Sequence, residues 1–273
     1  MSAAAVPVGL PGAPVVGEPI LRVRGVAHSY GGVQAVGGVD LDVEAGSFVG
    51  LIGPNGAGKT TLLDCISGAV RPARGSVTFR GRDVTGRPLH EIARLGLVRT
   101  FQTARVFGRM TVLSNQMAAP SGQLGERLLR AVLGGWRLQE AGQLADALEM
   151  LARFDIAAAA DQYGGALSGG QRRLTELARS LMARPSALLL DEPFAGVSPT
   201  NRRRLATHLQ TLSRDHGITV LMVEHRLELV EELCQRIVVM AEGRVIAQGS
   251  MADLRRNATV VSAYLGEVAP HAT

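Results

Sequence analysis

The chain has 273 residues, of which 46% are hydrophobic and 19% charged, and its formal net charge is +5. This length suits one large domain with a substantial core. No apolar stretch approaches the roughly 18 residues that span a bilayer, so we expect no transmembrane segment. The two cysteines, Cys65 and Cys234, lie far apart, which predicts a reduced protein with structural thiols. Basic residues are scattered, with residues 202–204 as the longest run, so we expect no nucleic-acid partner.

The N-terminal part of the chain predicts a tail followed by a small antiparallel sheet. Residues 1–19 are rich in alanine, valine, glycine and proline and lack the basic segment of a signal peptide, so we predict a disordered tail. Three later segments alternate apolar and polar residues, which is typical of half-buried strands. These segments are residues 21–26, 39–43 and 76–79.

The segment from Gly53 to Thr61 contains the single lysine among 29 basic residues. Its spacing of glycine, lysine and threonine is typical of a phosphate-binding loop between a buried strand, residues 48–52, and a glycine-closed helix, residues 60–68. Backbone N–H groups cradle phosphate oxygens there, and the lysine ammonium reaches the β- and γ-phosphates without the crowding of a guanidinium fork. We predict that the Thr60 hydroxyl contacts Mg²⁺. The predicted nucleotide contacts are Gly53, Asn55, Gly56, Gly58, Lys59, Thr60 and Thr61.

The remainder predicts a helical insertion in a layered α/β core. From about residue 103 to residue 178, apolar residues recur at helical spacing, which indicates an inserted helical subdomain. Beyond it, predicted strands alternate with predicted helices, which is the pattern of parallel α/β layering. The strands are residues 187–190, 218–223 and 236–240, and the helices are about residues 201–215 and 227–234.

Two acids follow the strand at residues 187–190. Asp191 and Glu192 would lie at the carboxyl edge of the sheet, where open α/β sheets bind ligands. We expect Asp191 to hold Mg²⁺ through its coordination shell and Glu192 to polarise the water that attacks the γ-phosphate. The alternative, two solvated acids after a strand, is weakened by the phosphate loop.

A Ser-Gly-Gly-Gln turn starting at Ser168 precedes a helix predicted over residues 172–182, and Ser168 or the glycines would cap that helix and bind an anion. With the phosphate loop and the Asp-Glu strand in this order, residues 21–267 resemble the ATPase subunit of ABC transporters. The resemblance implies an α/β P-loop NTPase fold, with a RecA-like core, a small antiparallel β-subdomain and the inserted helical subdomain. The implied ATP-binding domain covers residues 20–267, and residues 268–273 form a C-terminal tail.

The resemblance also implies roles for single residues. Tyr30 would be the aromatic platform for adenine, Gln102 would contact Mg²⁺ or water, and His225 would contact the γ-phosphate. The implied dimer is head to tail with a second ABC ATPase, so that the Ser168 turn contacts ATP held by Lys59 of the other subunit. The implied catalytic residues are Glu192, His225 and Gln102, the metal contacts are Thr60, Gln102 and Asp191, and the signature contacts to ATP are Ser168, Gly169, Gly170 and Gln171.

Within this family, several segments resemble the LivG-type ATPase of branched-chain amino-acid importers, among them residues 98–102, 107–112, 224–225 and 263–267. The expected function is ATP hydrolysis that drives uptake of branched-chain or other hydrophobic amino acids at the cytoplasmic face of the membrane. The expected partners are permease subunits and, indirectly, an extracytoplasmic solute-binding protein.

Other functions stay open from these residues. Some of the markers are shared with urea-type importers and with the ATPase of lipopolysaccharide export. A soluble ABC protein acting on nucleic acid or ribosomes and a non-hydrolysing regulatory cassette are further alternatives. The chain departs from the family pattern at Ser198, where an aspartate is usual, and at Arg226, where an acid commonly follows the histidine. Both departures are compatible with a heterodimer of unequal sites and with ordinary drift.

Overall fold

The structure is a computed structural model that describes residues 19–100, 105–119 and 136–265. Gln102, residues 1–18 of the predicted N-terminal tail and the predicted tail at residues 268–273 lie outside the described residues. The described chain divides into two compact units. The core unit comprises residues 19–99, 187–193 and 209–265, and the helical unit comprises the other described residues.

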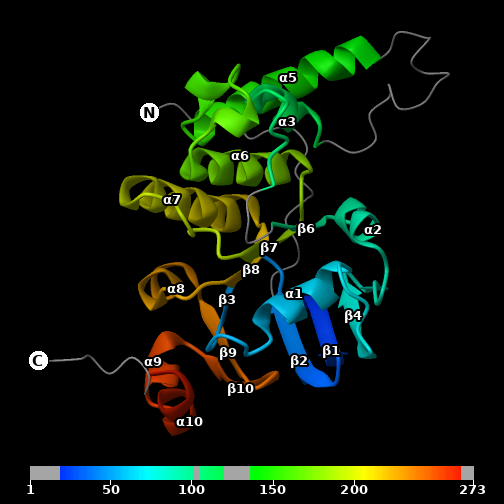
Figure 1. Cartoon of the computed structure of the whole chain (residues 1–273), viewed down its shortest axis with the longest axis vertical. Helices are drawn as coiled ribbons and strands as arrows, with labels where there is room; N and C mark the ends of the chain where they lie inside the picture. Colours follow the sequence, from blue (N-terminus) through cyan, green and yellow to red (C-terminus); the bar gives the residue numbers. More distant parts are fainter. Residues whose placement is uncertain (1–18, 101–104, 120–135, 266–273) are drawn as a thin grey trace, which may run out of the picture. The chain divides into compact units, whose positions relative to one another are not determined.

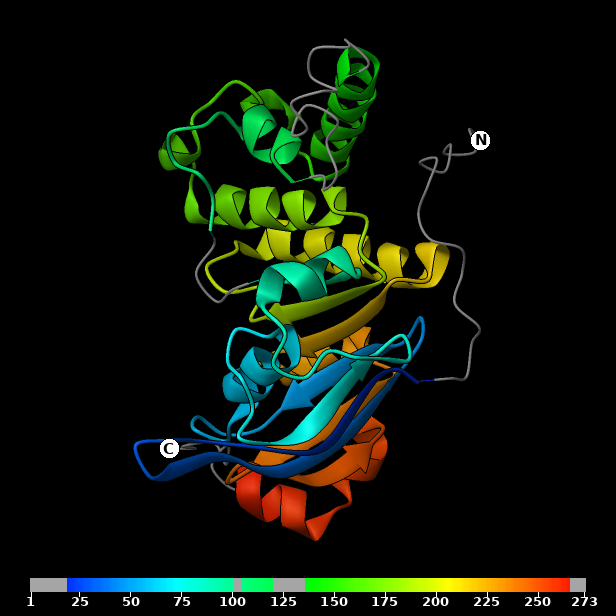
Figure 2. The same ribbon diagram turned by 90° about the vertical axis from the view of Figure 1, so that its right-hand side faces the viewer.

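An antiparallel sheet occupies the N-terminal part of the core unit, where β1 and β2 form a long curved hairpin (Figures 1 and 2). Leu21 and Val23 lie opposite Phe79 and Val77, and all four side chains are buried. The predicted antiparallel pairing is confirmed, although the first strand begins at Pro19, the last residue of the predicted tail. In the order β2-β1-β4-β5, the strands are Val33–Glu44, Pro19–Tyr30, Arg74–Phe79 and Arg82–Asp83.

Six strands form the second sheet of the core unit, in the order β10-β9-β3-β8-β7-β6. β10 pairs antiparallel with β9 at one edge, and the other pairs are parallel. β3, β7 and β8 are buried along their whole length, as strands covered on both faces are. The predicted parallel layering is confirmed, whereas the sequence pattern does not predict β6 or β10. The strands are Arg244–Gly249, Arg236–Ala241, Phe48–Ile52, Thr219–Val223, Ala187–Asp191 and Leu97–Arg99.

The helices of the core unit bury apolar faces in its core. Leu62, Leu63 and Ile66 of α1 are fully buried. α1 ends as predicted at a glycine, Gly68, whose N–H donates to the carbonyl of Asp64. The helices are α1 (Lys59–Ser67), α2 (Leu89–Arg94), α8 (Leu227–Leu233), α9 (Met251–Arg255) and α10 (Ala258–Val260).

The described part of the helical unit consists mainly of helices and turns, as its apolar spacing predicts. The helix predicted over residues 172–182 begins earlier, at Gly169, because the side chain of Ser168 caps it. Across the described residues, no helix is both long enough and apolar enough to cross a bilayer. The helices are α3 (Val112–Met117), α5 (Trp136–Arg153), α6 (Gly169–Met182) and α7 (Pro199–His216), the last of which ends in the core unit.

A buried asparagine holds the turn before α3. The Nδ2 of Asn115 donates to the carbonyls of Phe107, at 3.1 Å, and Thr111, at 2.9 Å, and its Oδ1 accepts the Phe107 N–H at 2.8 Å. Asn115 is 0% exposed, so water cannot replace these bonds. For the Phe107 N–H, Asn115 is the partner that the structure gives, whereas the carbonyls of Phe107 and Thr111 also accept the main-chain N–H groups of Met110, at 3.1 Å, and of Asn115 itself, at 2.9 Å.

Asn115→Leu should lower the free energy of unfolding by about 1–3 kcal/mol, because the Phe107 N–H loses its hydrogen-bond partner and two main-chain carbonyls lose one of theirs. Denaturant titration measures this change, and hydrogen exchange at the Phe107 amide should accelerate. Glu149→Ala, which removes the exposed Glu149–Arg153 pair, is the control and should change the free energy by about 0.5 kcal/mol or less. Equal losses in the two variants would contradict the role given to Asn115.

Candidate functional site

The phosphate-type loop lies between β3 and α1, and its backbone is fixed by close packing. At Gly53, φ is 151° and an added Cβ would lie 2.0 Å from the carbonyl oxygen of Met240. At Gly58, φ is 92° and a Cβ would lie 2.1 Å from the carbonyl oxygen of Ala35. No other residue fits at either position. The loop is therefore shaped by β9 on one side and β2 on the other.

Lys59 closes this loop. Its Nζ donates to the carbonyl oxygens of Gly53 and Pro54, both at 2.8 Å, and the residue is 6% exposed. Burial lowers the pKa of Lys59, and the negative charges of Glu192 and Asp191 oppose that shift. The loop lysine, Asp191 at the end of β7 and the following Glu192 thus belong to one electrostatic site, although the acids follow the lysine by more than 130 residues.

The other predicted nucleotide contacts of the core unit lie in the loop, in the first turn of α1 and at the end of β1. Asn55 and Thr60 are exposed, and Thr61 is half-buried in the first turn of α1. Tyr30 ends β1 and is 49% exposed, with its ring against that of His28 at 4.6 Å between centroids. An exposed ring supported from one side leaves a face on which a base can stack.

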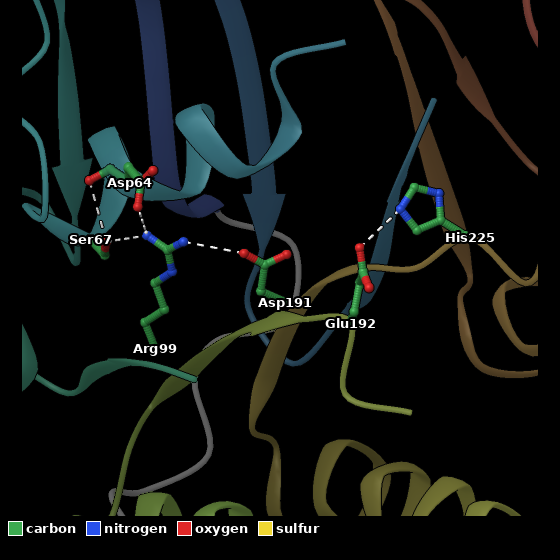
Figure 3. Close-up of polar contacts among 6 residues, drawn as sticks. All are labelled: Asp64, Ser67, Arg99, Asp191, Glu192 and His225. Atoms are coloured by element: carbon green, nitrogen blue, oxygen red, sulfur yellow. Dashed lines mark hydrogen bonds and ion pairs between the residues drawn. The ribbon is translucent and has the colours of Figure 1, made fainter. Parts of the chain in front are cut away.

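Asp191 is the last residue of β7 and is 1% exposed. Its Oδ2 accepts a hydrogen bond from Arg99 at 3.3 Å (Figure 3). Burial raises the pKa of the Asp191 carboxyl, and the neighbouring Arg99 guanidinium lowers it. Sequence reasoning assigned no role to Arg99, although the arginine lies within a segment that carries the family resemblance.

Glu192 has a left-handed backbone, with φ of 47°, and its N–H donates to the carbonyl of Val223 at 3.0 Å. This conformation costs a non-glycine residue on the order of 1–3 kcal/mol, and such strain clusters at functional sites. The Glu192 Oε1 lies 3.0 Å from the Nε2 of His225 (Figure 3). A carboxylate can only accept, so this contact requires a hydrogen on Nε2. The structure brings the predicted pair together.

The turn that presents His225 is held by a buried acid. Glu224 is 4% exposed, and its Oε1 accepts the backbone N–H groups of His225, at 3.2 Å, and Arg226, at 3.3 Å. Burial raises the pKa of Glu224, whereas the two N–H groups lower it. Sequence reasoning missed this role. The available signal was an acid directly before the histidine, at the end of a buried strand.

The donor set suits Mg²⁺. Magnesium prefers oxygen ligands and typically takes one or two protein groups besides phosphates and water. The carboxylate of Asp191, next to the lysine of the loop, and the hydroxyl of Thr60, exposed at the start of α1, supply such oxygens. Within the described residues, no cluster of three histidine, cysteine or acidic side chains forms an all-protein metal cage.

The Ser168 turn belongs to the helical unit. The Oγ of Ser168 accepts the Gln171 N–H at 3.3 Å, and the Gln171 Oε1 accepts the Ser168 N–H at 3.0 Å, which forms a capping box. Ser168 and Gly169 are exposed, and Gly170 is half-buried. The turn therefore presents the start of a 14-residue helix, where anions bind well.

Ser198, one of the departures from the family pattern, has a local role. Its Oγ accepts the Asn201 N–H at 3.5 Å, in the spacing of an N-cap at the start of α7. The other departure, Arg226, is exposed and precedes α8.

Comparisons with known proteins agree along the chain. The family described as "ABC transporter" matches residues 36–195, and that described as "Branched-chain amino acid ATP-binding cassette transporter" matches residues 244–270. The chain is 39% identical to the high-affinity branched-chain amino acid transport ATP-binding protein BraF of Pseudomonas aeruginosa, over 92% of this chain and 99% of BraF. It is 40% identical to a probable LivG of Archaeoglobus fulgidus, over 90% of this chain and 95% of the relative.

A solved structure shows the same fold. The ADP conformation of MJ1267, an ATP-binding cassette of an ABC transporter, matches with a TM-score of 0.76 and 33% identity, over 91% of this chain and 99% of that chain. The predicted α/β P-loop NTPase fold is confirmed. The first family match also spans the phosphate-type loop, the Ser168 turn and the Asp191-Glu192 pair. The chain belongs to the ABC transporter family and is one of its ATP-binding, ATP-hydrolysing subunits.

Proposed function

We propose that this subunit powers an importer for branched-chain or other hydrophobic amino acids. Two likenesses carry the proposal, one along nearly the whole chain and one at its C-terminal part. The cassette is nearly 40% identical to transport ATPases named for branched-chain amino acids, and residues 244–270 match a C-terminal family of the same name. The resemblances at residues 98–102 and 107–112 support it. A urea-type importer and lipopolysaccharide export are the rival systems for the same cassette.

The proposed ATP site lies in the core unit. Adenine stacks on Tyr30, and the phosphates lie in the loop, where backbone N–H groups and the Lys59 ammonium oppose their charge. Asp191 and the Thr60 hydroxyl would hold Mg²⁺, which would supply positive charge opposite the phosphates. Gln102 is proposed as a further contact. The loop contacts are Gly53, Asn55, Gly56, Gly58, Lys59, Thr60 and Thr61.

Hydrolysis is proposed to use the Glu192 and His225 pair. A water oxygen attacks the γ-phosphorus, the bond from that phosphorus to the bridging oxygen breaks, and Glu192 accepts the water proton. His225 contacts the γ-phosphate and, through its Nε2, orients the Glu192 carboxylate at 3.0 Å. The left-handed backbone at Glu192 fixes the direction in which the side chain leaves the main chain. The side-chain torsions then set where the carboxylate lies.

A second ABC ATPase completes the proposed site. The exposed Ser168 turn, with Gly169, Gly170 and Gln171, contacts the ATP bound by the partner, so ATP joins the two subunits and hydrolysis separates them. The permease subunits dock on the helical unit around Phe107, which is 53% exposed. A solute-binding protein outside the membrane delivers the amino acid. The chain is then peripheral, at the cytoplasmic face.

Glu192→Gln should leave ATP binding intact and lower the rate of phosphate release by about 100-fold or more, because the amide cannot accept the water proton. ATP-bound dimers should accumulate on gel filtration. Glu228→Gln, an exposed acid in α8, is the matched control and should hydrolyse at the parental rate. Phosphate release by Glu192→Gln at the parental rate would remove Glu192 as the base.

Lys59→Ala should weaken ATP binding by about tenfold or more, because a charged hydrogen bond to phosphate is lost. Lys59→Arg should not restore the affinity, since its fork crowds a loop closed by two carbonyl contacts. Titration calorimetry measures both. ATP affinity unchanged in Lys59→Ala would show that the loop does not cradle the phosphates.

The tagged protein, purified in mild detergent from its own cells, should bring down polytopic permeases and a second ABC ATPase. Vesicles containing that complex, supplied with its solute-binding protein, should take up labelled leucine or valine only with ATP, and not with Glu192→Gln in place of the parent. Uptake of urea in place of amino acids would reassign the substrate. Co-purification of ribosomes or DNA without a membrane subunit would overturn the transporter role.

A further inference from the structure

Arg99 ends β6 as a deeply buried cation. Its side chain is 3% exposed, and its backbone lies beside Leu189 of β7 in the parallel register. Removing a guanidinium from water costs several kcal/mol unless anionic partners surround it, so such a residue is tied to its neighbours. The proposed ATP site described above uses no atom of Arg99.

The Arg99 guanidinium joins two elements of that site (Figure 3). Nη1 contacts the Asp64 carboxylate and donates to the Ser67 Oγ at 3.1 Å, and both partners lie on α1, the helix that follows the loop. Nη2 donates to Asp191 at 3.3 Å. A guanidinium can do this because its donors form a rigid planar fork.

The Arg99 guanidinium restricts the position of the Asp191 carboxylate. The Asp191 carboxylate is 2% exposed, so bulk water does little to orient it, and the donor of Arg99 holds its Oδ2 in place. Side chains that hydrogen-bond to a metal ligand orient that ligand, and their removal typically alters the affinity for the metal. Because the same fork is fixed to α1, the carboxylate is held relative to the helix that begins with Lys59 and Thr60.

We propose that Arg99 is a positioning residue for the Mg²⁺ site, which clamps the Asp191 carboxylate to the helix of the phosphate loop. The inference rests on the proposed function, in which Asp191 holds the metal. Arg99 touches neither nucleotide nor metal in this role. It acts through Asp191, so its removal should affect metal-dependent nucleotide binding and spare the metal-independent part.

The test compares two affinities of the full chain for the non-hydrolysable analogue adenylyl imidodiphosphate, one with Mn²⁺ and one with a chelator. The affinity with Mn²⁺ divided by the affinity with the chelator measures the contribution of the metal. Electron paramagnetic resonance measures Mn²⁺ binding independently. Arg99→Met should lower the ratio by about tenfold or more while the affinity in chelator stays parental. Arg99→Lys keeps the charge but not the fork, and should recover part of the ratio.

Two further variants distinguish a failure of the role given to Arg99 from a failure of the proposed metal site. Arg24→Met removes an arginine from the exposed Arg24–Asp42 pair of the same unit and should keep the parental ratio. Asp191→Asn should lower the ratio at least as far as Arg99→Met. If Asp191→Asn lowers the ratio and Arg99→Met and Arg99→Lys do not, the inference fails and the metal site stands. If Asp191→Asn leaves the ratio unchanged, the proposed metal site and the inference both fail.

Discussion

The loop between β3 and α1 has so little room that its shape is decided by the surrounding backbone. The carbonyls of Met240 and Ala35 would each lie about 2 Å from a side chain at Gly53 or Gly58. Met240 belongs to β9 of the parallel sheet, and Ala35 belongs to β2 of the antiparallel sheet. The backbones of both sheets of the core unit therefore determine the shape of the loop.

Charges alternate in sign behind this loop, where Lys59, Arg99 and Asp191 are buried and their acidic neighbours Asp64 and Glu192 are half-buried. Lys59 lies in the field of Asp191 and Glu192, and Arg99 connects Asp191 with Asp64. Each charge would be unfavourable alone in a medium of low polarity, and each is stabilised by its neighbours. This arrangement makes the site sensitive to single substitutions, because removal of one member leaves an opposite charge buried without compensation.

Local signals in the sequence were sufficient for the strand, loop and helix around Lys59 and for the two acids at the end of β7, since each is encoded within a dozen consecutive residues. Arg99 illustrates what was not predictable. Its partners Ser67, Asp64 and Asp191 lie 32, 35 and 92 positions away, and only the fold brings them together, through α1 and the pairing of β6 with β7. Glu224 lies next to His225 in sequence, yet its hydrogen bonds depend on a turn that periodicity does not encode. The start of α6 was misplaced because Gly169 and Gly170 are poor helix formers whose place in the helix depends on the Ser168 cap.

The single lysine limits how the chain reacts with reagents that modify primary amines. Apart from the terminal amine, Lys59 is the one primary amine in the sequence, and it is 6% exposed with its Nζ held by two carbonyls. Amine-directed reagents that label most proteins at random would find a single internal target here, reachable only when the loop releases the side chain. A lysine-specific protease would likewise have one place to cut. The reactivity of the Lys59 amine toward such reagents thus reports on the release of its side chain from the loop, without any engineered probe.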